Sequence, residues 1–319
     1  MPTDTNLDRA IYDLLSHQCP AMWLGFPIGT GNVYWVDSTN GVVGNSGIRP
    51  DLAVPSIIEA LTLCVDDNND YIMVIEDYRE GETITVNKTR VHIIGLANYL
   101  RQNSNSPYVA LHASTDGDFP IFTVSALSNN CEIAGFMIGG GATHAGIENP
   151  AGTPMGLHIH DNVFGHFFSH DDPRDGISIE LNATNIRIEH CVFLGTPHGK
   201  GFITRDGIRW LTGGDPLNGA IENNQFKALP GIAINFAQVA ANTGGISLLR
   251  NIFNVLDTAN GEAITLNTTP AGMLVDQNHA MYGNAQVGYG QNPFRDLNAP
   301  NNDWGVNYRG NLVIEPVIV

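Results

Sequence analysis

The chain has 319 residues and carries 32 aspartate and glutamate residues against 15 lysine and arginine residues, a formal net charge of −17. A surface this acidic repels phosphate backbones and anionic lipids, so we expect neither nucleic acid nor a membrane surface as a partner. The 35 glycines and the low charged content of 15% are typical of a β-rich chain with many tight turns.

The cysteines and the first residues of the chain indicate in which cellular compartment the protein is made. Cys19, Cys64, Cys131 and Cys191 are scattered without a CxxC pair, which favours buried thiols over disulfides or a metal site. The polar start of the chain lacks a basic region followed by an apolar one, and no run of 18 apolar residues occurs. We therefore expect synthesis in a host cytoplasm without a signal peptide, and no cofactor.

Residues 1–30 form a first segment with helical periodicity. Leu7, Ile11 and Leu14 recur at the spacing of one helical face. A short amphipathic helix before a solenoid caps the first coil or anchors the chain to another subunit. We favour the cap and keep these three residues as candidates for docking.

The next segment predicts a strand, a Gly/Asn loop and a helix. The strand begins at Tyr34-Trp35-Val36-Asp37, and the helix follows Pro55 with Ser56 or Asp51 as its cap. This arrangement resembles the entry segment of right-handed parallel β-helix proteins of the pectate-lyase-like superfamily, of the phage-structural type. The resemblance implies an all-β solenoid with short N-terminal capping helices, and it implies little about activity.

Two degenerate strand patterns then recur along the chain. The first is Gly-Φ-x-Φ, where Φ is apolar, and it begins at Gly156, Gly176, Gly201 and Gly231, with a looser copy at Ala263. The second is Φ-x-x-N-x-F, beginning at Ile188, Ile221, Leu248 and Leu274, in steps of 33, 27 and 26 residues. Such a period predicts a solenoid with stacked apolar side chains. Asn224 and Asn251 occupy equivalent positions and predict an inward asparagine ladder.

The solenoid is expected to span residues 31–282. Its first two coils are predicted from six apolar runs: Tyr71–Tyr78, Glu82–Val86, Val91–Ala97, Tyr108–Ala113, Pro120–Ala126 and Cys131–Gly139. From residue 283 to 319 the pattern gives way to Gly, Asn and Pro and then to an apolar ending. This extended segment is predicted to cap its own coil or to act as an arm that enters a neighbouring subunit. Its candidate docking residues are Leu312, Val313, Ile314, Val317 and Val319.

Histidines gather in one stretch and suggest a metal site. The five are His144, His158, His160, His166 and His170. His158 and His160 alternate with apolar residues, so both imidazoles should face outward on the same side of one strand. Two histidines and a carboxylate suit zinc or iron, yet no fixed motif accompanies them. We favour exposed histidines on the solenoid flank and keep the pair as metal candidates.

A group of carboxylates near one turn is the candidate for catalysis. Polysaccharide hydrolysis requires two carboxyl groups, and Asp172, Asp175, Glu180 and Arg205 lie in or near two successive strands. In register, Glu180 and Arg205 would continue an outward column with Asn235 and Asn267. The Asn-Thr-Asp, Gly-His-Gly and Arg-x-Lys motifs of polygalacturonases are missing, and only fragments of a pectate-lyase site occur. We favour a chance grouping.

Two functions remain open. The favoured one is a non-enzymatic virion structural protein, a capsid decoration or cement protein or a tail-associated protein, which forms a trimer or another small homo-oligomer and binds a capsid or tail protein. The alternative is a polysaccharide depolymerase, a hydrolase or a lyase, or a glycan-binding tailspike-like module.

Overall fold

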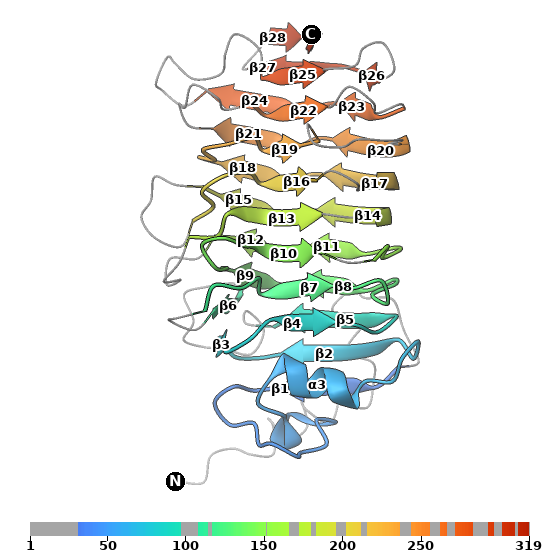
Figure 1. Cartoon of the computed structure of the whole chain (residues 1–319), viewed down its shortest axis with the longest axis vertical. Coiled ribbons are helices and arrows are strands. Elements are labelled where there is room, and N and C mark those ends of the chain that lie inside the picture. Colours follow the sequence, from blue (N-terminus) through green and yellow to red (C-terminus); the bar gives the residue numbers. More distant parts are fainter. Residues whose placement is uncertain are drawn as a thin grey trace, which may run out of the picture.

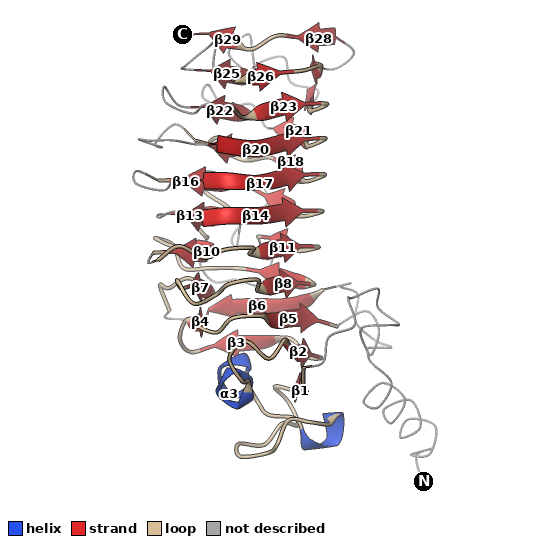
Figure 2. Ribbon diagram, turned by 90° about the vertical axis from the view of Figure 1, so that its right-hand side faces the viewer, coloured by secondary structure: helices blue, strands red, loops and turns tan. Residues whose placement is uncertain are grey.

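The computed structural model describes residues 31–96, 108–113, 117–150, 152–165, 172–179, 183–195, 202–211, 216–236, 244–255, 262–266, 272–282, 293–296, 302–309 and 312–318. This part of the chain winds into a tall solenoid of short strands, with a small helical region at its N-terminal end (Figures 1 and 2). The predicted all-β parallel β-helix is confirmed. None of the helices described here has the length and apolarity needed to cross a membrane.

Three sheets, here named A, B and C, form the walls of the described solenoid. Sheet A contains β1 (Val33–Val36), β2 (Asp70–Val74), β5 (Val91–Gly95), β8 (Glu132–Ala134), β11 (His158–His160), β14 (Ala183–Glu189), β17 (Pro216–Glu222), β20 (Gly244–Leu249), β23 (Leu274–Asp276) and β26 (Asp303–Trp304). Sheet B contains β3 (Tyr78–Glu80), β6 (Val109–Ala113), β9 (Phe136–Ile138), β12 (Val163–Phe164), β15 (Val192–Leu194), β18 (Gln225–Lys227), β21 (Ile252–Val255), β24 (His279–Tyr282), β27 (Asn307–Arg309) and β28 (Leu312–Ile314). Sheet C contains β4 (Ile84–Val86), β7 (Phe122–Val124), β10 (Ala145–Asn149), β13 (Asp175–Ile179), β16 (Ile208–Trp210), β19 (Ile234–Asn235), β22 (Ile264–Leu266), β25 (Phe294–Asp296) and β29 (Val317–Ile318).

From β2 to β27 the chain visits sheets A, B and C in turn, and each strand pairs in parallel with the strand one coil further on. The sharp corner between sheets A and B recurs with the same backbone conformation. Its first residue has a positive φ in five successive coils: Asp161, His190, Asn223, Arg250 and Gln277. This left-handed residue turns the chain, and the residue that follows it points into the core.

The interior is built from aligned apolar side chains, as the repeats predict. Phe164, Phe193 and Phe226 stack face to face with ring centroids 4.7 Å apart in each pair, and Phe253 follows at 5.1 Å. All four rings are fully buried or nearly so. Burying an aromatic side chain of this kind contributes about 1.5–3 kcal/mol, so the stack is a large part of the coil's stability.

The predicted asparagine ladder is confirmed, and it extends beyond the two predicted residues, Asn224 and Asn251. Asn224 and Asn251 are fully buried, and each side-chain amide donates to a backbone carbonyl of the preceding coil. Each amide also donates to the next asparagine, from Asn224 to Asn251 at 3.1 Å and from Asn251 to Asn278 at 3.0 Å. Asn307 extends the ladder beyond Asn278, and Cys191 takes the slot before Asn224.

Several of the predicted registers are wrong. Val275, rather than Leu274, pairs with Leu248, so the ladder position falls on Asn278 instead of Gln277. The strand predicted from Gly201 lies instead at Ile208–Trp210, and Ile234 pairs with Ile208, which leaves Ile232 only half-buried. The copy at Gly156 belongs to sheet A, whereas the copy at Gly176 belongs to sheet C. Residues of similar pattern therefore line two different walls.

Two predicted strands are each divided by a corner. The run Tyr71–Tyr78 ends one strand of sheet A at Val74 and begins β3 of sheet B at Tyr78. The run Cys131–Gly139 contains β8 and β9, which are separated by Gly135 at φ +81°. The apolar pattern continues through each corner because residues on both sides of it face the same core.

At the N-terminal end, α3 (Ile57–Leu63) covers the first coil. Its cap is Ser56, one of the two predicted caps, whose hydroxyl oxygen accepts a hydrogen bond from the Glu59 amide at 3.1 Å. Ile57 and Leu61 are buried in the same core as Val36 of β1. A short 3₁₀ helix, η1 (Pro50–Leu52), precedes it. The helix predicted around Leu7, Ile11 and Leu14 lies outside the described residues.

The C-terminal strands pair with their own coil. The solenoid was predicted to end at residue 282. Parallel pairing continues past this residue through β25, β26 and β27. Then β28 pairs antiparallel with β27, and β29 pairs in parallel with β25. The segment therefore forms the last layer of the coil.

Candidate functional site

A row of ionisable side chains lies on the outer face of sheet A, from β5 to the corner after β20. In β11 the middle residue, Ile159, is fully buried, while His158 and His160 on either side of it are half-buried. The two imidazoles therefore face the same outward side of the strand, as the alternation predicts. Their ring centroids are 4.1 Å apart.

The parallel register brings carboxylates of neighbouring coils to these histidines. Glu132 of β8 is aligned with His158, and Glu189 of β14 is aligned with His160. Nε2 of His160 lies 2.6 Å from Oε1 of Glu132, and Nε2 of His158 lies 2.8 Å from Oε1 of Glu189. Each histidine thus contacts a carboxylate from a different neighbouring strand.

Further groups hold both members of the His160–Glu132 pair. Nδ1 of His160 lies 2.7 Å from Oδ2 of Asp161, and Nδ1 of His92 lies 2.6 Å from Oε2 of Glu132. Nε2 of His92 is 3.1 Å from the side-chain oxygen of Asn69. The Glu132 side chain is 9% exposed and that of His160 is 12% exposed, so this cluster is largely shielded from water.

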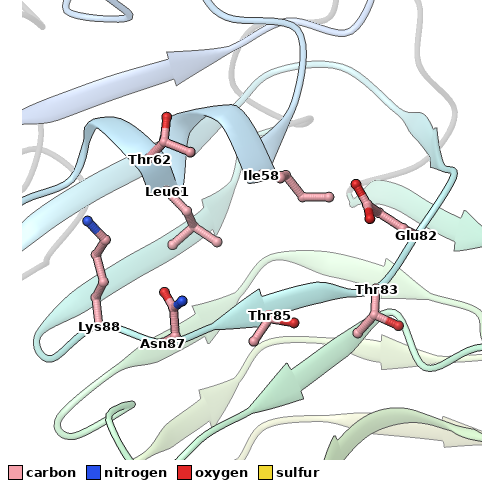
Figure 3. Close-up of a pocket in the computed structure, with 8 residues that line it drawn as sticks. All are labelled: Ile58, Leu61, Thr62, Glu82, Thr83, Thr85, Asn87 and Lys88. Atoms are coloured by element: carbon pink, nitrogen blue, oxygen red, sulfur yellow. The ribbon is translucent and has the colours of Figure 1, made fainter.

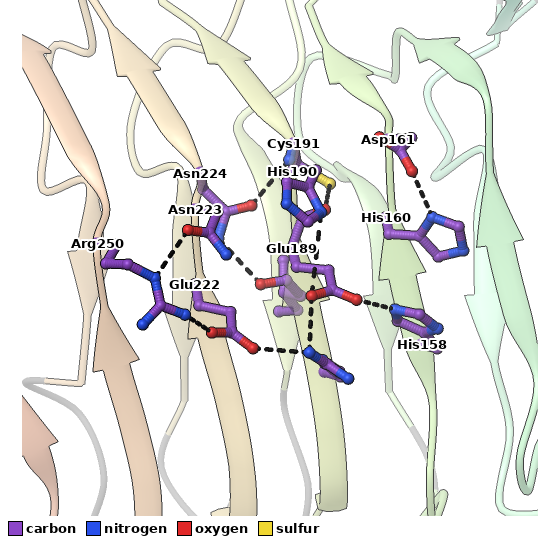
Figure 4. Close-up of polar contacts among 12 residues, drawn as sticks. His158, His160, Asp161, Glu189, His190, Cys191, Glu222, Asn223, Asn224 and Arg250 are labelled. Atoms are coloured by element: carbon purple, nitrogen blue, oxygen red, sulfur yellow. Dashed lines mark hydrogen bonds and ion pairs between the residues drawn. The ribbon is translucent and has the colours of Figure 1, made fainter.

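The network continues along the solenoid through arginines (Figure 4). Nη2 of Arg187 lies 3.0 Å from Glu189 and 2.8 Å from Glu222. Arg250 contacts the other oxygen of Glu222 and donates from Nε to Asn223 at 3.0 Å. The carboxylates of this row are therefore bonded to histidine or arginine side chains.

The protonation states follow from these contacts. Burial alone would raise the pKa of Glu132, but hydrogen bonds from His160 and His92 outweigh it and lower that pKa to about 2. Burial likewise opposes the charge on His160, yet its bonds to Asp161 and Glu132 raise the pKa of His160 to about 9. Burial and the charge of His160 lower the pKa of His158. At neutral pH the cluster holds a carboxylate–imidazolium pair beside a neutral imidazole.

Three of these residues bring possible metal-ligating atoms together. One such atom from each of Glu132, His158 and His160 lies within 4.8 Å of the others. Sequence reasoning found the two histidines and missed Glu132, which is separated from His160 by 28 positions. His144, another member of the predicted group, instead contacts Glu148 of sheet C. His166 and His170 lie outside the described residues.

The predicted catalytic residues that the structure describes lie in or beside sheet C, and two of them are in contact. Asp175 is fully buried, and the guanidinium group of Arg205 contacts both of its oxygens, with Nε 2.7 Å from Oδ1. Nε of Arg174 lies 3.3 Å from Oδ2. Asp172 is half-buried just before β13, and Glu180 lies outside the described residues. The Asp175 carboxylate is thus enclosed by arginines and inaccessible to solvent.

Asp206, which follows Arg205 in the chain and is not one of the predicted catalytic residues, is the second buried carboxylate of this cluster. It accepts hydrogen bonds from the Ile232 amide at 2.8 Å and from Asn235 at 2.9 Å, and Arg209 lies 3.2 Å away. Burial, the largest effect, raises its pKa, and the nearby charge of Asp175 adds to the shift. Its position directly after Arg205 is the signal that the sequence offers for it.

The predicted outward column is wrong in its register. Asn235 pairs with Arg209 rather than with Arg205, and Arg209 in turn pairs with Ser178. Arg205 precedes β16 and reaches Asp175 from the corner of the coil. The error follows from the misplaced strand at Gly201.

A cavity of about 330 Å³ opens between α3 and the edge strand β4 (Figure 3). Ile58 and Leu61 of the helix line one side, and Thr83, Thr85 and Lys88 line the other. None of the predicted catalytic or metal residues that the structure describes lines it. The cavity lies at the capped end of the solenoid, away from both ionisable clusters.

No protein-family profile matches the chain, and no curated protein matches it. Among solved structures, the enzymatically active domain of tailspike protein 2 from bacteriophage CBA120 is similar over 92% of this chain and 48% of its own, with 13% identity and a TM-score of 0.31. The Dettilon tailspike protein is similar over 87% of this chain and 68% of its own, with 13% identity and a TM-score of 0.36. The chain spans about half the length of the first of these proteins. Similarity at this level carries no conclusion about activity, and membership of the pectate-lyase-like superfamily stays a prediction.

Proposed function

We propose that this chain is a non-enzymatic structural protein of a phage-type virion, in which the solenoid is an acidic shaft that decorates the capsid or tail. The observation that carries this proposal is the pairing of the outer-face carboxylates. Glu132, Glu189 and Glu222 on sheet A contact histidine or arginine, and Asp175 near sheet C is enclosed by arginines. A general acid or base must reach the proton that it transfers, and carboxylates held in this way support rigidity rather than catalysis.

The C-terminal end of the coil supports a docking role. Among the described strands, sheets A, B and C end at β26, β28 and β29. The last strand of a sheet presents unpaired backbone groups that a further strand can satisfy. Val313 of β28 is also 62% exposed. In this proposal, Leu312–Ile318 contacts a second copy of the chain in a trimer or another small homo-oligomer.

Particle composition tests the virion assignment. We expect quantitative mass spectrometry of purified particles to find this protein at a fixed copy number per particle after repeated gradient centrifugation. The variant Asp172→Asn should be incorporated at the same copy number, because a structural role assigns no proton transfer to that carboxyl group. A protein that remains wholly in the soluble fraction of the lysate would contradict the proposal.

One observation favours a second candidate, a polysaccharide depolymerase or glycan-binding tailspike-like module. Burial raises the pKa of Asp206, which lies beside the carboxyl group of Asp175, and glycoside hydrolysis uses two carboxyl groups, of which the acid has a raised pKa. Incubation of the protein with a panel of bacterial surface polysaccharides tests it. Cleavage that Asp206→Asn abolishes without a change in circular dichroism would favour the enzyme. The absence of both cleavage and retention on immobilised glycans would reject this candidate.

A further inference from the structure

We propose that Glu132, His158 and His160 form a binding site for one divalent transition-metal ion, and that zinc is the ion this set of donors favours. The proposal does not depend on the proposed function, because it concerns only the side chains on the outer face of β8 and β11. It rests on three observations: the donor atoms lie close together, each donor side chain has a second hydrogen-bond partner, and two imidazoles with one carboxylate are ligands that zinc prefers.

The three side chains converge on one point of the surface. One possible ligand atom of each side chain lies within 4.8 Å of those of the other two, and donors in a tetrahedral zinc site with bonds of 2.0–2.2 Å are about 3.3–3.6 Å apart. Rotation of side chains that already touch is enough to close this difference. The backbone needs no movement, because Glu132 and His158 are aligned partners in adjacent strands.

Each donor is already held by a second group, as in known metal sites. Asp161 binds Nδ1 of His160, which leaves Nε2 to face the metal, and Glu189 binds Nε2 of His158, which leaves Nδ1. A carboxylate on the far nitrogen fixes the tautomer and the ring orientation of a ligating histidine. His92 binds Oε2 of Glu132 and leaves Oε1 for the metal. All three ligands thus have an outer partner.

A cation is also suited to the position between the donors. Nε2 of His160 and Oε1 of Glu132 are 2.6 Å apart, a hydrogen-bond distance at which one proton lies between them. A metal ion would replace this proton and bridge the same two atoms, and the imidazole would release the proton to solvent. The surrounding carboxylates of Asp161 and Glu189 add negative charge near the ion.

The donor set selects the class of metal. Two imidazoles and one carboxylate suit zinc and its neighbours cobalt, nickel and copper, whereas calcium and magnesium require oxygen ligands. Three protein ligands leave the fourth tetrahedral position for water on the side of His158, whose side chain is 33% exposed. The bound ion would join the coil that contains β8 to the coil that contains β11.

Calorimetric titration of the full-length protein with zinc chloride tests the site. The protein is first stripped with EDTA and dialysed to pH 8. We expect saturable binding that His158→Gln or His160→Gln weakens more than about 100-fold, and Glu189→Gln by about 10- to 100-fold. The matched control is His144→Gln, which removes a histidine that also contacts a glutamate but lies outside the cluster, and it should keep the wild-type affinity.

X-ray absorption at the zinc edge of the loaded wild-type protein gives a readout that needs no variant. Two imidazoles and light-atom ligands near 2.0 Å would support the site, since about 2.0–2.1 Å is the expected zinc–nitrogen distance. The proposal is overturned if the folded wild-type protein binds no zinc, if the zinc spectrum lacks imidazole, or if His160→Gln keeps the wild-type affinity. The proposal is also overturned if His144→Gln loses zinc binding while His158→Gln and His160→Gln keep it.

Discussion

The asparagine ladder allows one prediction to be worked out in detail, the effect of Asn251→Ala on stability. The Asn251 side chain is fully buried and takes part in four hydrogen bonds of 2.9–3.1 Å. It donates to the Ile221 carbonyl and to Asn278, and its oxygen accepts from the backbone and side-chain amides of Asn224. Alanine cannot replace any of these bonds.

The cost follows from the groups that lose their partner. Asn224 keeps a second acceptor for its side-chain amide, the Ile188 carbonyl, so that group is only partly affected. The Asn224 backbone amide and the Ile221 carbonyl lose the partner that Asn251 provided. Each buried polar group left without a partner costs about 1–3 kcal/mol, so we expect a loss of about 2–6 kcal/mol in the free energy of unfolding.

Urea denaturation followed by circular dichroism measures this loss. The matched control is Asn254→Ala, which removes the same side chain from an exposed position on β21 and should change the free energy of unfolding by less than about 0.5 kcal/mol. If the two variants unfold at the same urea concentration, the ladder does not support the corner between sheets A and B, and the reasoning fails.

Three further predictions concern the core and the ionisable cluster. Phe193→Ala, which removes a ring stacked between two others, should cost about 3–5 kcal/mol in the same urea assay, and a cost below 1 kcal/mol would contradict the stack. Cys191→Asn should raise the free energy of unfolding by about 1 kcal/mol, because it places an amide in the one ladder slot between Asn162 and Asn224 that lacks it; a lower stability would show that the slot is too small. The Glu132–His160 pair should stabilise the metal-free protein most between pH 4.5 and 6.5. The lowered pKa of Glu132 gives stability above pH 4.5 that is lost as the pH falls towards about 2, and the raised pKa of His160 gives stability below pH 6.5 that is lost as the pH rises through about 9. The difference in unfolding free energy between wild type and Glu132→Gln in EDTA should therefore peak in this window, and a difference independent of pH would contradict it.

Much of the fold could be predicted because its signals are local and repeat. The Φ-x-x-N-x-F pattern contains both the buried asparagine and the stacked phenylalanine of one corner, so reading Asn224 and Asn251 was enough to predict the ladder. The entry strand and the helix capped by Ser56 are likewise encoded within a few residues. These elements depend little on the length of the loops between them.

Register could not be predicted, because the coils differ in length. Gly201 and Gly207 both precede apolar residues, and only pairing with neighbouring coils selects Ile208 as the strand residue. The same pattern at Gly156 and Gly176 gives no information on which sheet it joins. Glu132 reaches His158 and His160 only because β8 pairs with β11 in this register. Its place in the histidine cluster therefore could not be predicted from the sequence.

The carboxylate group illustrates the same limit. Asp175 and Arg205 were singled out for catalysis because both are charged and lie near strands. The structure shows that Arg205 pairs with a fully buried Asp175, which the spacing of the two residues does not reveal. The burial of Asp206 beside this pair could not be predicted, because charged residues are seldom expected in the interior.

The solution mass of the protein tests the central claim, that the chain is a structural shaft that docks through its C-terminal strands. Light scattering should show a small oligomer for the full-length protein and a monomer for Val313→Asp, whose valine is 62% exposed and therefore not needed for folding. The control is Val306→Asp, which changes a valine that is 46% exposed on the turn before β27 and should leave the oligomer intact. A full-length protein that is monomeric, or an oligomer that survives both Val313→Asp and deletion of Leu312–Ile318, would contradict the account.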